Sequence, residues 1–319
     1  MSLVSVIVPL YNAEAFILKT LESILQENTV PLEIIVVNDR SSDRSEEIVQ
    51  TIKDPRVKII SGLGQGISAA LNLGLAEAKG DIIMRCDADD LYSPKRLAQQ
   101  FNWLSKHPEF SAVCGSFCNI DVKGKLVSNL NTGQNAEEIT EELLNGITRT
   151  HLCTFAVRSD ILRASGGFRE YFETAEDLDL QLRLAELGRV WYVPEIQYCY
   201  RLHDLSITHT QATVRRKFFE SIASEFQRQR KERGSDDLQQ GCPPNPPEAE
   251  ARSATNASEH IQNMLIGRAW QEYKKKQRLQ ALATGLRSIF VSPGKLNAWR
   301  SFIALVFKVM TYKFNIIGN

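Results

Sequence analysis

The hydrophobic pattern of the first 120 residues alternates between short apolar runs and longer amphipathic segments. The apolar runs are rich in Val and Ile and are predicted to be strands: residues 4–9, 33–38, 57–61 and 81–86. The segments between and after them have helical length: residues 13–27, 43–53, 65–79 and 95–106. This order predicts βαβ units and a parallel sheet. The strands lack polar alternation, as is typical when helices cover both faces of a sheet.

The rest of the chain is less regular. Further strands are predicted at residues 111–119, 153–157 and 190–193, and a helix at 175–187, where apolar residues recur at helical spacing. Residues 234–256 are rich in Pro, Gly and polar side chains and favour a linker, and two or three helices are expected after residue 260. We therefore predict a catalytic domain over residues 1–232, divided into halves at residues 1–120 and 121–232, then a flexible linker (233–257) and a helical segment (258–319).

Charge and cysteine content narrow the class of protein. The 38 basic and 38 acidic residues cancel, so no overall field favours nucleic acid, and none is expected as a partner. The six cysteines form no CxxC pair and are expected to be buried free thiols in a reducing compartment. The N-terminal run lacks a basic region and contains Pro9, which favours a strand over a signal peptide. Together with the cysteines, this favours a cytoplasmic location. No apolar stretch is long enough to cross a bilayer, so the chain is expected not to span a membrane.

Polar residues follow three of the predicted strands. They are Tyr11-Asn12, Asn38-Asp39 and the segment from Asp87 to Asp90. Ligands of open α/β sheets bind at the carboxyl ends of the strands, so these ends form a candidate site. Three carboxylates within four residues suit a hard cation such as Mg²⁺ or Mn²⁺ that also binds a diphosphate. The alternative is a solvated acidic turn in which Asp90 caps the next helix.

The order of these motifs resembles the family 2 glycosyltransferases, whose catalytic domain has the GT-A fold. The segments that carry the resemblance are VSVIVPLYNAEAFI, EIIVVNDRSSDRS, GLGQGISAALNLGLAEAKGDII, CDADDLYSPKRLAQQ, SDILRASGGFRE, TAEDLDLQLRLAELG and YRLHDLSIT. They extend to about residue 208, or about two thirds of the chain. The resemblance implies an α/β GT-A fold, with a mostly parallel sheet flanked by helices and a C-terminal helical extension.

On the donor side, the resemblance implies that Pro9 and Tyr11 border the nucleotide. It also implies that Asp39 accepts a hydrogen bond from the imide of a uracil-like base. Asn38 and Arg40 replace the first Asp and the Gly of the family's frequent DDGS form, which leaves the preferred base open. Alternatively, Asp39 is a turn residue before the next helix.

The segment GLGQGISAALN would form the loop and helix start beneath the nucleotide, where glycines allow close approach of the backbone. Asn72 lies in this helix and is assigned to the nucleotide-sugar site. Leu71 stands where many relatives have Arg, so a phosphate contact made by that Arg is absent. Arg85, just before the acidic cluster, is the candidate to replace it.

The resemblance assigns the metal to the acidic cluster. Asp87 would contact the ribose or the metal, and Asp89 would bind Mn²⁺ or Mg²⁺ directly. The metal would neutralise charge that develops on the diphosphate leaving group. His203 lies where relatives often place a metal- or diphosphate-contacting His, although a lone His is also commonly structural.

On the acceptor side, the resemblance places the catalytic base at the acid pair Glu176-Asp177, with Asp177 as the base. A carboxylate at a helix N-terminus is favoured in its ionised form, which suits removal of a proton from an acceptor hydroxyl. Acids in the first turn of a helix are also common without any chemistry. His151 matches a His that often begins the acceptor-side strand in the family. Tyr200 and Arg201 are candidates to orient the acceptor or the diphosphate, with packing within a strand as the alternative.

These assignments predict a metal-dependent, inverting hexosyl- or N-acetylhexosaminyl-transferase that uses a nucleotide-diphosphate sugar, with a UDP-sugar expected. The acceptor would be a hydroxyl of a saccharide or glycolipid in cell-surface polysaccharide assembly. The enzyme is expected to be non-processive, because no QxxRW motif follows the acid pair. Two alternatives stay open: a nucleotidyltransferase, which usually has a Gly-rich basic loop where this chain has PLYNAEAF, and a non-catalytic nucleotide-sugar- or carbohydrate-binding subunit.

The C-terminal segment combines a basic entry, YKKKQR, with the apolar and aromatic finish WRSFIALVFKVM. Such a segment suits peripheral contact with a membrane, at the inner face of the plasma membrane. Packing on the catalytic domain, or pairing in a homodimer, explains the same apolar stripe.

Overall fold

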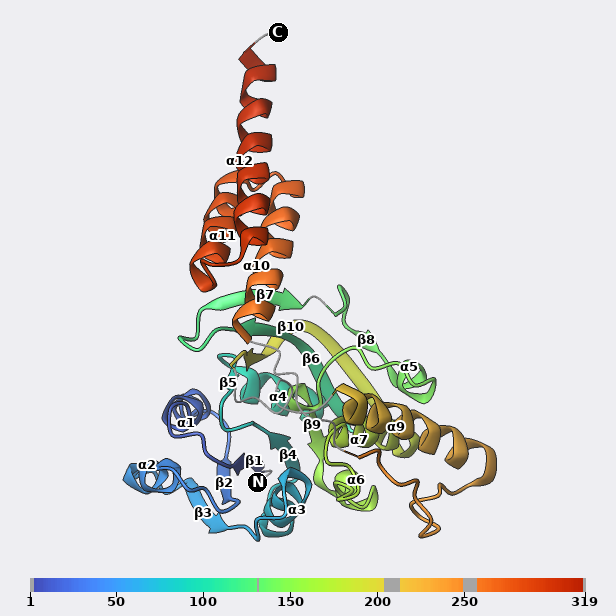
Figure 1. The fold of residues 1–319 in the computed structure, drawn as a ribbon. Helices are drawn as coiled ribbons and strands as arrows, with labels where there is room; N and C mark the ends of the chain where they lie inside the picture. The colour runs from blue at the N-terminus through green and yellow to red at the C-terminus, as the bar shows by residue number, and fades with distance from the viewer. Residues whose placement is uncertain (1–2, 131, 204–212, 249–256, 318–319) are drawn as a thin grey trace. The chain divides into compact units, whose positions relative to one another are not determined.

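The structure is a computed structural model, and it describes residues 3–130, 132–203, 213–248 and 257–317 (Figure 1). The chain divides into two compact units. The first comprises Met1–Phe117, Leu130–Tyr200 and Thr213–Glu250, and the second comprises Cys118–Asn129, Arg201–Ala212 and Ala251–Asn319. The predicted site residues belong to the first unit, except His203 and the further position Arg201, which belong to the second.

The strands, in chain order, are β1 (Val4–Leu10), β2 (Leu32–Asn38), β3 (Val57–Ser61), β4 (Ile82–Arg85), β5 (Leu91–Tyr92), β6 (Phe110–Ile120), β7 (Leu126–Leu130), β8 (Glu137–Glu138), β9 (Ala156–Arg158) and β10 (Arg189–Arg201). The helices are α1 (Ile17–Leu25), α2 (Ser45–Thr51), α3 (Ile67–Glu77), α4 (Arg96–Lys106), α5 (Thr140–Leu144), α6 (Ser159–Ala164), α7 (Glu176–Leu187), α9 (Thr213–Arg233), α10 (Ala257–Lys274), α11 (Arg278–Val291) and α12 (Leu296–Ile317), with a short 3-10 helix, η1 (Leu152–Thr154). Each predicted element overlaps an observed one, but β10 continues eight residues beyond the strand predicted at residues 190–193, and the strand predicted at residues 153–157 is shorter than expected.

Within the described residues the strands form one sheet, in the order β3-β2-β1-β4-β9-β6-β10-β5, with β7 beside β6 and β8 beside β10. The pairings β1–β2, β1–β4 and β2–β3 are parallel, as the βαβ pattern predicts. By contrast, β9 is antiparallel to both β4 and β6, and β10 is antiparallel to β5 and β8. The sheet is therefore mixed: β3, β2, β1 and β4 are parallel to one another, whereas the β9 and β5 strands run antiparallel to their partners.

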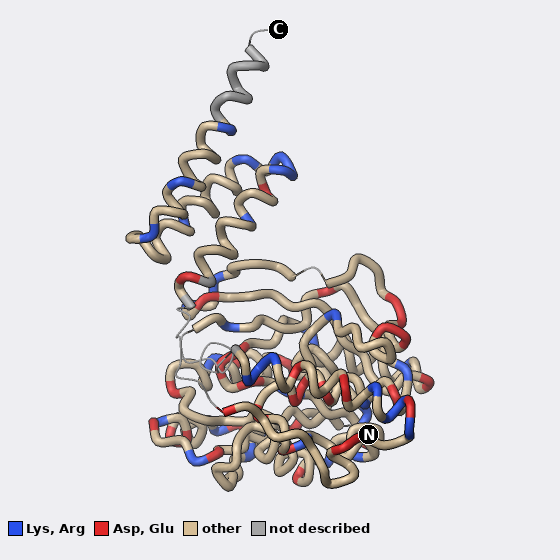
Figure 2. The backbone as a smooth tube through the Cα atoms, turned by 45° about the vertical axis from the view of Figure 1, so that its right-hand side comes forward, with Lys and Arg blue, Asp and Glu red and all other residues tan. Residues whose placement is uncertain are grey.

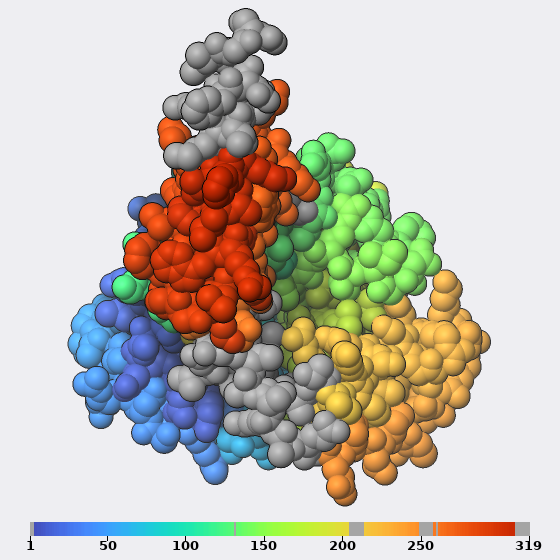
Figure 3. Space-filling model, turned by 45° about the horizontal axis from the view of Figure 1, so that its top comes forward, coloured from blue at the N-terminus to red at the C-terminus, as the bar shows by residue number. Residues whose placement is uncertain are grey.

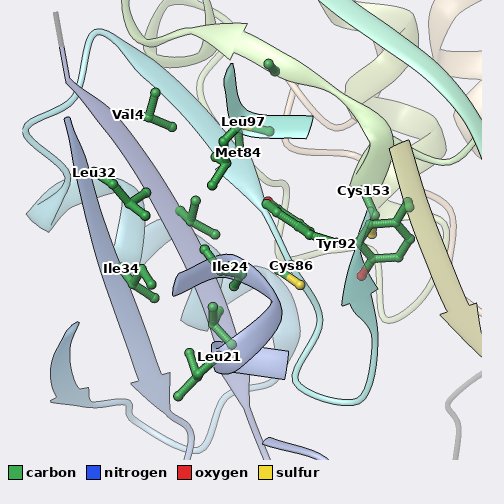
Figure 4. Packing of buried hydrophobic residues seen from close by; sticks show 14 of the residues in the cluster. Val4, Leu21, Ile24, Leu32, Ile34, Met84, Cys86, Tyr92, Leu97 and Cys153 are labelled. Atoms are coloured by element: carbon green, nitrogen blue, oxygen red, sulfur yellow. The ribbon is translucent and has the colours of Figure 1, made fainter. Parts of the chain in front are cut away.

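Two hydrophobic cores lie on opposite faces of this sheet. Along β1, Val4, Val6 and Val8 enter the first core and Ile7 enters the second. Helices α1, α2 and α4 cover the first core, part of which is shown in Figure 4, and α3, α6 and α7 cover the second. Gly74 lets α3 approach the strands closely, because a Cβ atom there would lie 2.4 Å from Cγ2 of Ile7. The apolar strands thus reflect coverage on both faces.

The segment predicted as a strand at residues 153–157 begins with the 3-10 turn η1. Two buried side chains of α4 occupy its carbonyl groups: Arg96 donates to the carbonyl of Phe155 at 3.2 Å, and Gln100 donates to that of Thr154 at 2.8 Å. Because these side chains provide the hydrogen-bond partners of the carbonyls, the backbone of this segment does not need to pair with a neighbouring strand until β9 begins.

A buried network of charges connects α7 to α9 and to the start of the predicted linker. Arg183 pairs with Asp179 at 2.7 Å, and Arg169 lies 3.6 Å from Asp179 and 2.7 Å from Asp236. Arg230 of α9 also pairs with Asp236. Asp179 and Asp236 are both fully buried.

The described part of the predicted linker, up to residue 248, therefore packs on the first unit, which differs from the flexible segment expected from composition. Asp236 takes part in the buried charge network, and the carbonyl of Pro244 accepts a hydrogen bond from the Tyr171 hydroxyl at 2.6 Å. Residues 249–256 of the predicted linker lie outside the described residues.

The second unit joins the tip of the β6–β7 hairpin to the three C-terminal helices, which run alongside one another in Figure 1. Arg287 of α11 donates to Oδ2 of Asp121 at 2.6 Å, and Arg268 of α10 donates to the carbonyl of Val127 at 3.1 Å. Gly285 lets α12 approach α11, because a Cβ atom there would lie 2.9 Å from Phe302. The predicted helical segment is thus a small bundle.

Two further expectations concern membranes and cysteines. In the described parts of the chain, no helix combines the length and the apolar character needed to cross a membrane. All six cysteines are thiols outside any disulfide, as predicted; Cys86, Cys114, Cys118 and Cys153 are buried, whereas Cys242 is exposed.

Candidate active site

Asp39 follows β2 and ties this strand to the glycine-rich loop before α3. Its Oδ1 atom accepts a hydrogen bond from the amide of Gly64 at 2.6 Å, and its Oδ2 atom accepts one from the amide of Gly66 at 2.9 Å. A Cβ atom on Gly62 would lie 2.7 Å from Oδ1 of Asp39, so the backbone closes around the carboxylate only because glycine is there. Carboxylate oxygens have further lone pairs, so Asp39 is still able to accept a hydrogen bond from a base imide.

The acidic segment after β4 is folded into a turn against α1. The amide of Asp90 donates to the carbonyl of Asp87 at 3.1 Å. The hydroxyl of Thr20 lies 2.9 Å from the carbonyl of Ala88 and 2.8 Å from that of Asp90. Asp90 is buried, whereas Asp87 and Asp89 are half-buried. The turn thus places Asp87 and Asp89 at the carboxyl edge of the sheet, as predicted.

Arg85 joins acids from two distant parts of the chain. Its Nε donates to Oδ1 of Asp87 at 2.6 Å, its Nη2 donates to Oδ2 at 3.2 Å, and its Nη1 donates to Oε1 of Glu176 at 3.0 Å. Arg85 and Glu176 are both buried. Charged, two-pronged hydrogen bonds of this kind fix geometry strongly. The bridge therefore holds the acidic segment after β4 and the acid pair at the start of α7 in one place.

Three side chains that the sequence did not single out support this bridge. The Tyr198 hydroxyl accepts a hydrogen bond from the amide of Asp87 at 3.0 Å, and the Tyr92 hydroxyl donates to the carbonyl of Arg85 at 2.9 Å. The thiol of Cys153 lies 3.4 Å from Oδ2 of Asp87. Burial and the nearby Asp87 charge hold the pKa of Cys153 well above its usual range, so this thiol is a neutral donor.

Asp177 lies beside Glu176 in the first turn of α7, and its side chain is 30% exposed. Nδ1 of His151 is 3.9 Å from its Oδ2, and the His151 ring stacks on Tyr200 with 5.9 Å between centroids. Burial tends to raise the pKa of Asp177, but His151 and Arg85 outweigh it, so the pKa lies below the ordinary value. Asp177 is therefore an ionised, accessible carboxylate at neutral pH, as a general base requires.

Glu176 behaves in the opposite way. Its burial raises the pKa from 4.5 to about 7, in spite of the Arg85 guanidinium, and the neighbouring Asp177 charge adds to the rise. Two adjacent carboxyls thus have pKa values that their environments push apart, a pattern found at sites of proton transfer.

We expect Glu176→Gln to change how stability depends on pH. Because the folded state raises the pKa, the unfolded chain ionises first as pH rises above 4.5, and the folded protein loses stability until pH passes about 7. The variant lacks this titration, so between pH 5 and pH 8 the wild type should lose on the order of 2 kcal/mol relative to it. Urea denaturation of both proteins across this pH range measures the difference. Parallel pH profiles would contradict the raised pKa.

The remaining predicted residues are placed as follows. Tyr11 is 64% exposed beyond the end of β1, and Pro9 is half-buried near the end of the same strand. Asn72 donates through Nδ2 to the carbonyl of Phe168 at 2.7 Å and accepts from the amide of Phe168 at 2.8 Å. Its amide therefore clamps α3 to the loop before α7. Its nucleotide-sugar role, like that of Arg85, stays a prediction.

The metal assignment is compatible with the side chains present. No group of three or more His, Cys, Asp or Glu is arranged to hold a metal ion in the described residues. His203 is buried and belongs to the second unit, so its role as a ligand stays a prediction. Asp87 and Asp89 supply carboxylate oxygens at the edge of the sheet, and a hard cation often takes its other ligands from water and substrate phosphates. The donor set thus fits Mg²⁺ or Mn²⁺ bound together with a diphosphate.

Comparison of the sequence with known families gives a clear match. The sequence model described as "Glycosyl transferase family 2" covers residues 5–174, just over half of the chain. A chondroitin synthase of Pasteurella multocida is 30% identical over 232 residues, which cover 72% of this chain and 24% of that protein. A hyaluronan synthase of Pasteurella multocida is 30% identical over 218 residues, or 67% of this chain and 22% of that protein. The chain thus spans about a quarter of these two relatives.

One relative nearer in length also matches the chain, and a solved structure has a similar fold. The uncharacterized glycosyltransferase EpsJ of Bacillus subtilis is 32% identical over 217 residues, or 65% of this chain and 63% of that protein. The crystal structure of S. aureus TarS 1-349 in complex with UDP-GlcNAc has a TM-score of 0.61 and 16% identity, and covers 96% of this chain and 79% of that chain. At this identity the likeness concerns the fold alone, and it confirms the predicted GT-A fold.

Proposed function

Because this chain belongs to glycosyltransferase family 2 and is a glycosyltransferase, we propose that it transfers a hexose or N-acetylhexosamine from a UDP-sugar to a hydroxyl group, with inversion at the sugar carbon. The acceptor in this proposal is a saccharide or glycolipid used in cell-surface polysaccharide assembly. The names of two relatives, chondroitin synthase and hyaluronan synthase, support a polysaccharide product. The UDP-GlcNAc bound in the TarS crystal structure supports a UDP-sugar as the donor.

The Arg85 bridge is the observation that carries the proposal. A transferase must hold a donor and an acceptor at once, and Arg85 ties Asp87, on the donor side, to Glu176, the neighbour of the proposed base. Fixing two reacting groups in one place is a large part of what an enzyme contributes to a two-substrate reaction. A protein that only binds nucleotide-sugars has no need for the second acid group.

In this proposal each of the chain's own residues has a distinct role. Asp39 and the loop from Gly62 to Gly66 bind the nucleotide, and Asp89, with Asp87, supplies oxygen ligands to a divalent cation. When bound, that cation neutralises charge on the diphosphate leaving group. Asp177 accepts the proton of the acceptor hydroxyl as its oxygen attacks the sugar carbon from the face opposite the diphosphate. The sugar–phosphate bond breaks, and the sugar–oxygen bond forms with inversion.

The proposal also covers the cellular compartment, the number of sugars transferred per encounter and the oligomeric state. We place the reaction in the cytoplasm, since six cysteines outside any disulfide fit a reducing compartment. A single transfer per encounter is proposed, since QxxRW is missing after Asp177. Homodimer formation stays a prediction. A nucleotidyltransferase remains the second enzyme class, but the half-buried, accessible carboxylate of Asp177 beside His151 favours deprotonation of an acceptor hydroxyl.

Donor binding tests the proposal directly. UDP-sugars at about 100 times their Kd should stabilise the protein by about 2.7 kcal/mol when Mn²⁺ is present and much less with EDTA. A thermal-shift screen of UDP-, GDP- and dTDP-sugars, followed by assay of released UDP, measures this. Asp89→Asn should lose the metal-dependent part of the shift, whereas Asp160→Asn, an exposed acid in the first turn of α6, should keep it. The proposal would be contradicted if no nucleotide-sugar stabilised the protein, or if the stabilisation were the same with and without metal.

A further inference from the structure

The outward face of α11 is apolar instead of polar. Its exposed side chains include Leu279, Ala283, Leu286 and Phe290, which recur every three or four residues and so share one face of the helix. Leu279 is 85% exposed and Phe290 is 73% exposed. The opposite face, with the buried Ala281 and Ile289, packs within the bundle. A helix on the surface of a water-soluble bundle normally shows the reverse pattern outside its core.

The outward face of α12 repeats this arrangement. Leu296, Trp299, Ile303 and Phe307 are all exposed and occupy one face, while Ala298 and Leu305 are buried on the other. Exposed Asn297, Arg300 and Lys308 lie along one side of the apolar row. Thus an apolar row is bordered by a polar row that carries two cations, over the described length of α12. Figure 3 shows the surface that α12 presents, in red.

These two faces contain half of the exposed large apolar side chains of the described residues. They are Leu279, Leu286, Phe290, Leu296, Trp299, Ile303 and Phe307. Apolar surface concentrated in this way marks an interaction site, in contrast to single apolar residues scattered over a surface. We call these seven residues the apolar face of the second unit.

Charge identifies the partner that this face fits. The net charge of the whole chain is zero, but residues 258–319 contain ten basic and only two acidic residues, a net charge of +8. Residues 1–257 contain 28 basic and 36 acidic residues, a net charge of −8. Figure 2 shows the basic residues as blue segments along the C-terminal helices, including the turn between α10 and α11. In this turn, Lys274, Lys275 and Lys276 are all exposed.

We propose that the apolar face of the second unit binds the surface of an anionic lipid bilayer, with α11 and α12 lying in the plane of the interface. Apolar side chains enter the acyl boundary, Trp299 lies at headgroup level, and the cations contact anionic headgroups. Each basic residue near such a surface adds to the attraction, which the net charge of +8 makes substantial. In a dimer formed through this face, two segments that each carry a net charge of +8 would face each other, so electrostatic repulsion opposes self-association.

Vesicle sedimentation tests this inference without any nucleotide-sugar, so its result is independent of the proposed transfer reaction. The full chain is mixed with phosphatidylcholine vesicles, or with vesicles that also contain about a third phosphatidylglycerol, at low and high salt. We expect binding to the anionic vesicles, which weakens as salt rises. Phe290→Ser combined with Phe307→Ser should lower the partition coefficient at least about tenfold, because two aromatic side chains no longer enter the bilayer. Lys274→Gln, Lys275→Gln and Lys276→Gln together should weaken binding and reduce its salt dependence.

The matched control combines Leu18→Ser with Ile147→Ser. These residues are 43% and 55% exposed and belong to the first unit. The control should bind vesicles like the wild type. Failure to bind anionic vesicles, equal binding to neutral vesicles, or an equal loss in the control would each overturn the proposal. So would analytical ultracentrifugation that shows a dimer in the wild type and a monomer in the Phe290/Phe307 variant, since a second copy would then cover the face.

Discussion

Replacing Asp177 with Asn is expected to lower kcat for sugar transfer by about 10²–10⁴-fold, because the amide cannot accept the proton of the acceptor hydroxyl. The Asp177 carboxylate is accessible, and His151 and Arg85 hold its pKa below the ordinary value, so it is ionised at neutral pH. Donor binding should change little, since Asp39 and Asp89 are untouched. Steady-state assay of UDP release with acceptor, alongside titration of the donor by calorimetry, separates the two quantities.

Asp160→Asn serves as the matched control for Asp177→Asn. Asp160 is an exposed acid in the first turn of α6, so its replacement changes the same kind of helix-terminal charge away from the site. Its kcat should stay within about twofold of the wild type, because surface substitutions of this kind have small effects. An Asp177→Asn enzyme with undiminished turnover would remove Asp177 from the mechanism and leave the base unassigned.

The second large effect concerns stability. Asp236→Asn is expected to reduce the free energy of unfolding by about 3–5 kcal/mol, because it removes the fully buried carboxylate that Arg169 and Arg230 share, and these two side chains are only 12% and 8% exposed. Asp236 is fully buried and lies 2.7 Å from Arg169. Burial opposes its charged form, but the backbone amide of Gln239 and both arginines hold the pKa of Asp236 below its ordinary value. Urea denaturation, monitored by circular dichroism, measures the loss.

Glu232→Gln provides the comparison for Asp236→Asn. Glu232 also pairs with an arginine, Arg228 of the same helix, but the two side chains are 57% and 56% exposed. Solvent screens an exposed pair, which therefore contributes little to stability, so this variant should resemble the wild type. If the two variants lost equal stability, the burial of Asp236 would not be the cause of its effect.

The sequence was most informative where one physical rule determined the outcome. Unbroken apolar strands predict helices on both faces, and in β1 Val6 and Ile7 do enter separate cores. Because parallel strands end at one edge, the polar residues after β2 and β4 were expected to lie at a common edge, and Asp39 and Asp87 both lie there. Family resemblance then supplied the choice of acids, which periodicity alone does not distinguish from helix-capping residues.

Pairings across the fold were beyond prediction from one sequence. The bridge from Arg85 to Glu176 spans 91 positions, and the two residues meet because β4 and α7 contribute to the same hydrophobic core. Cys153 and Tyr198 support Asp87 for the same reason, and neither stands in a pattern that suggests a polar contact. The start of the predicted linker shows the converse. Composition there favoured a flexible segment, but composition does not record that Asp236 finds two arginines inside the fold.

The clasp between Asp39 and the loop of Gly64 and Gly66 has a consequence for the entropy of donor capture. Fixing the backbone of one residue costs about 1–2 kcal/mol, and glycine, with the widest choice of unfolded conformations, loses the most. The carboxylate holds this loop through contacts within the protein itself, so that loss of entropy belongs to folding. In the proposed function, a nucleotide that docks on this loop meets a backbone that is already ordered, so little of its binding free energy is spent on ordering the loop.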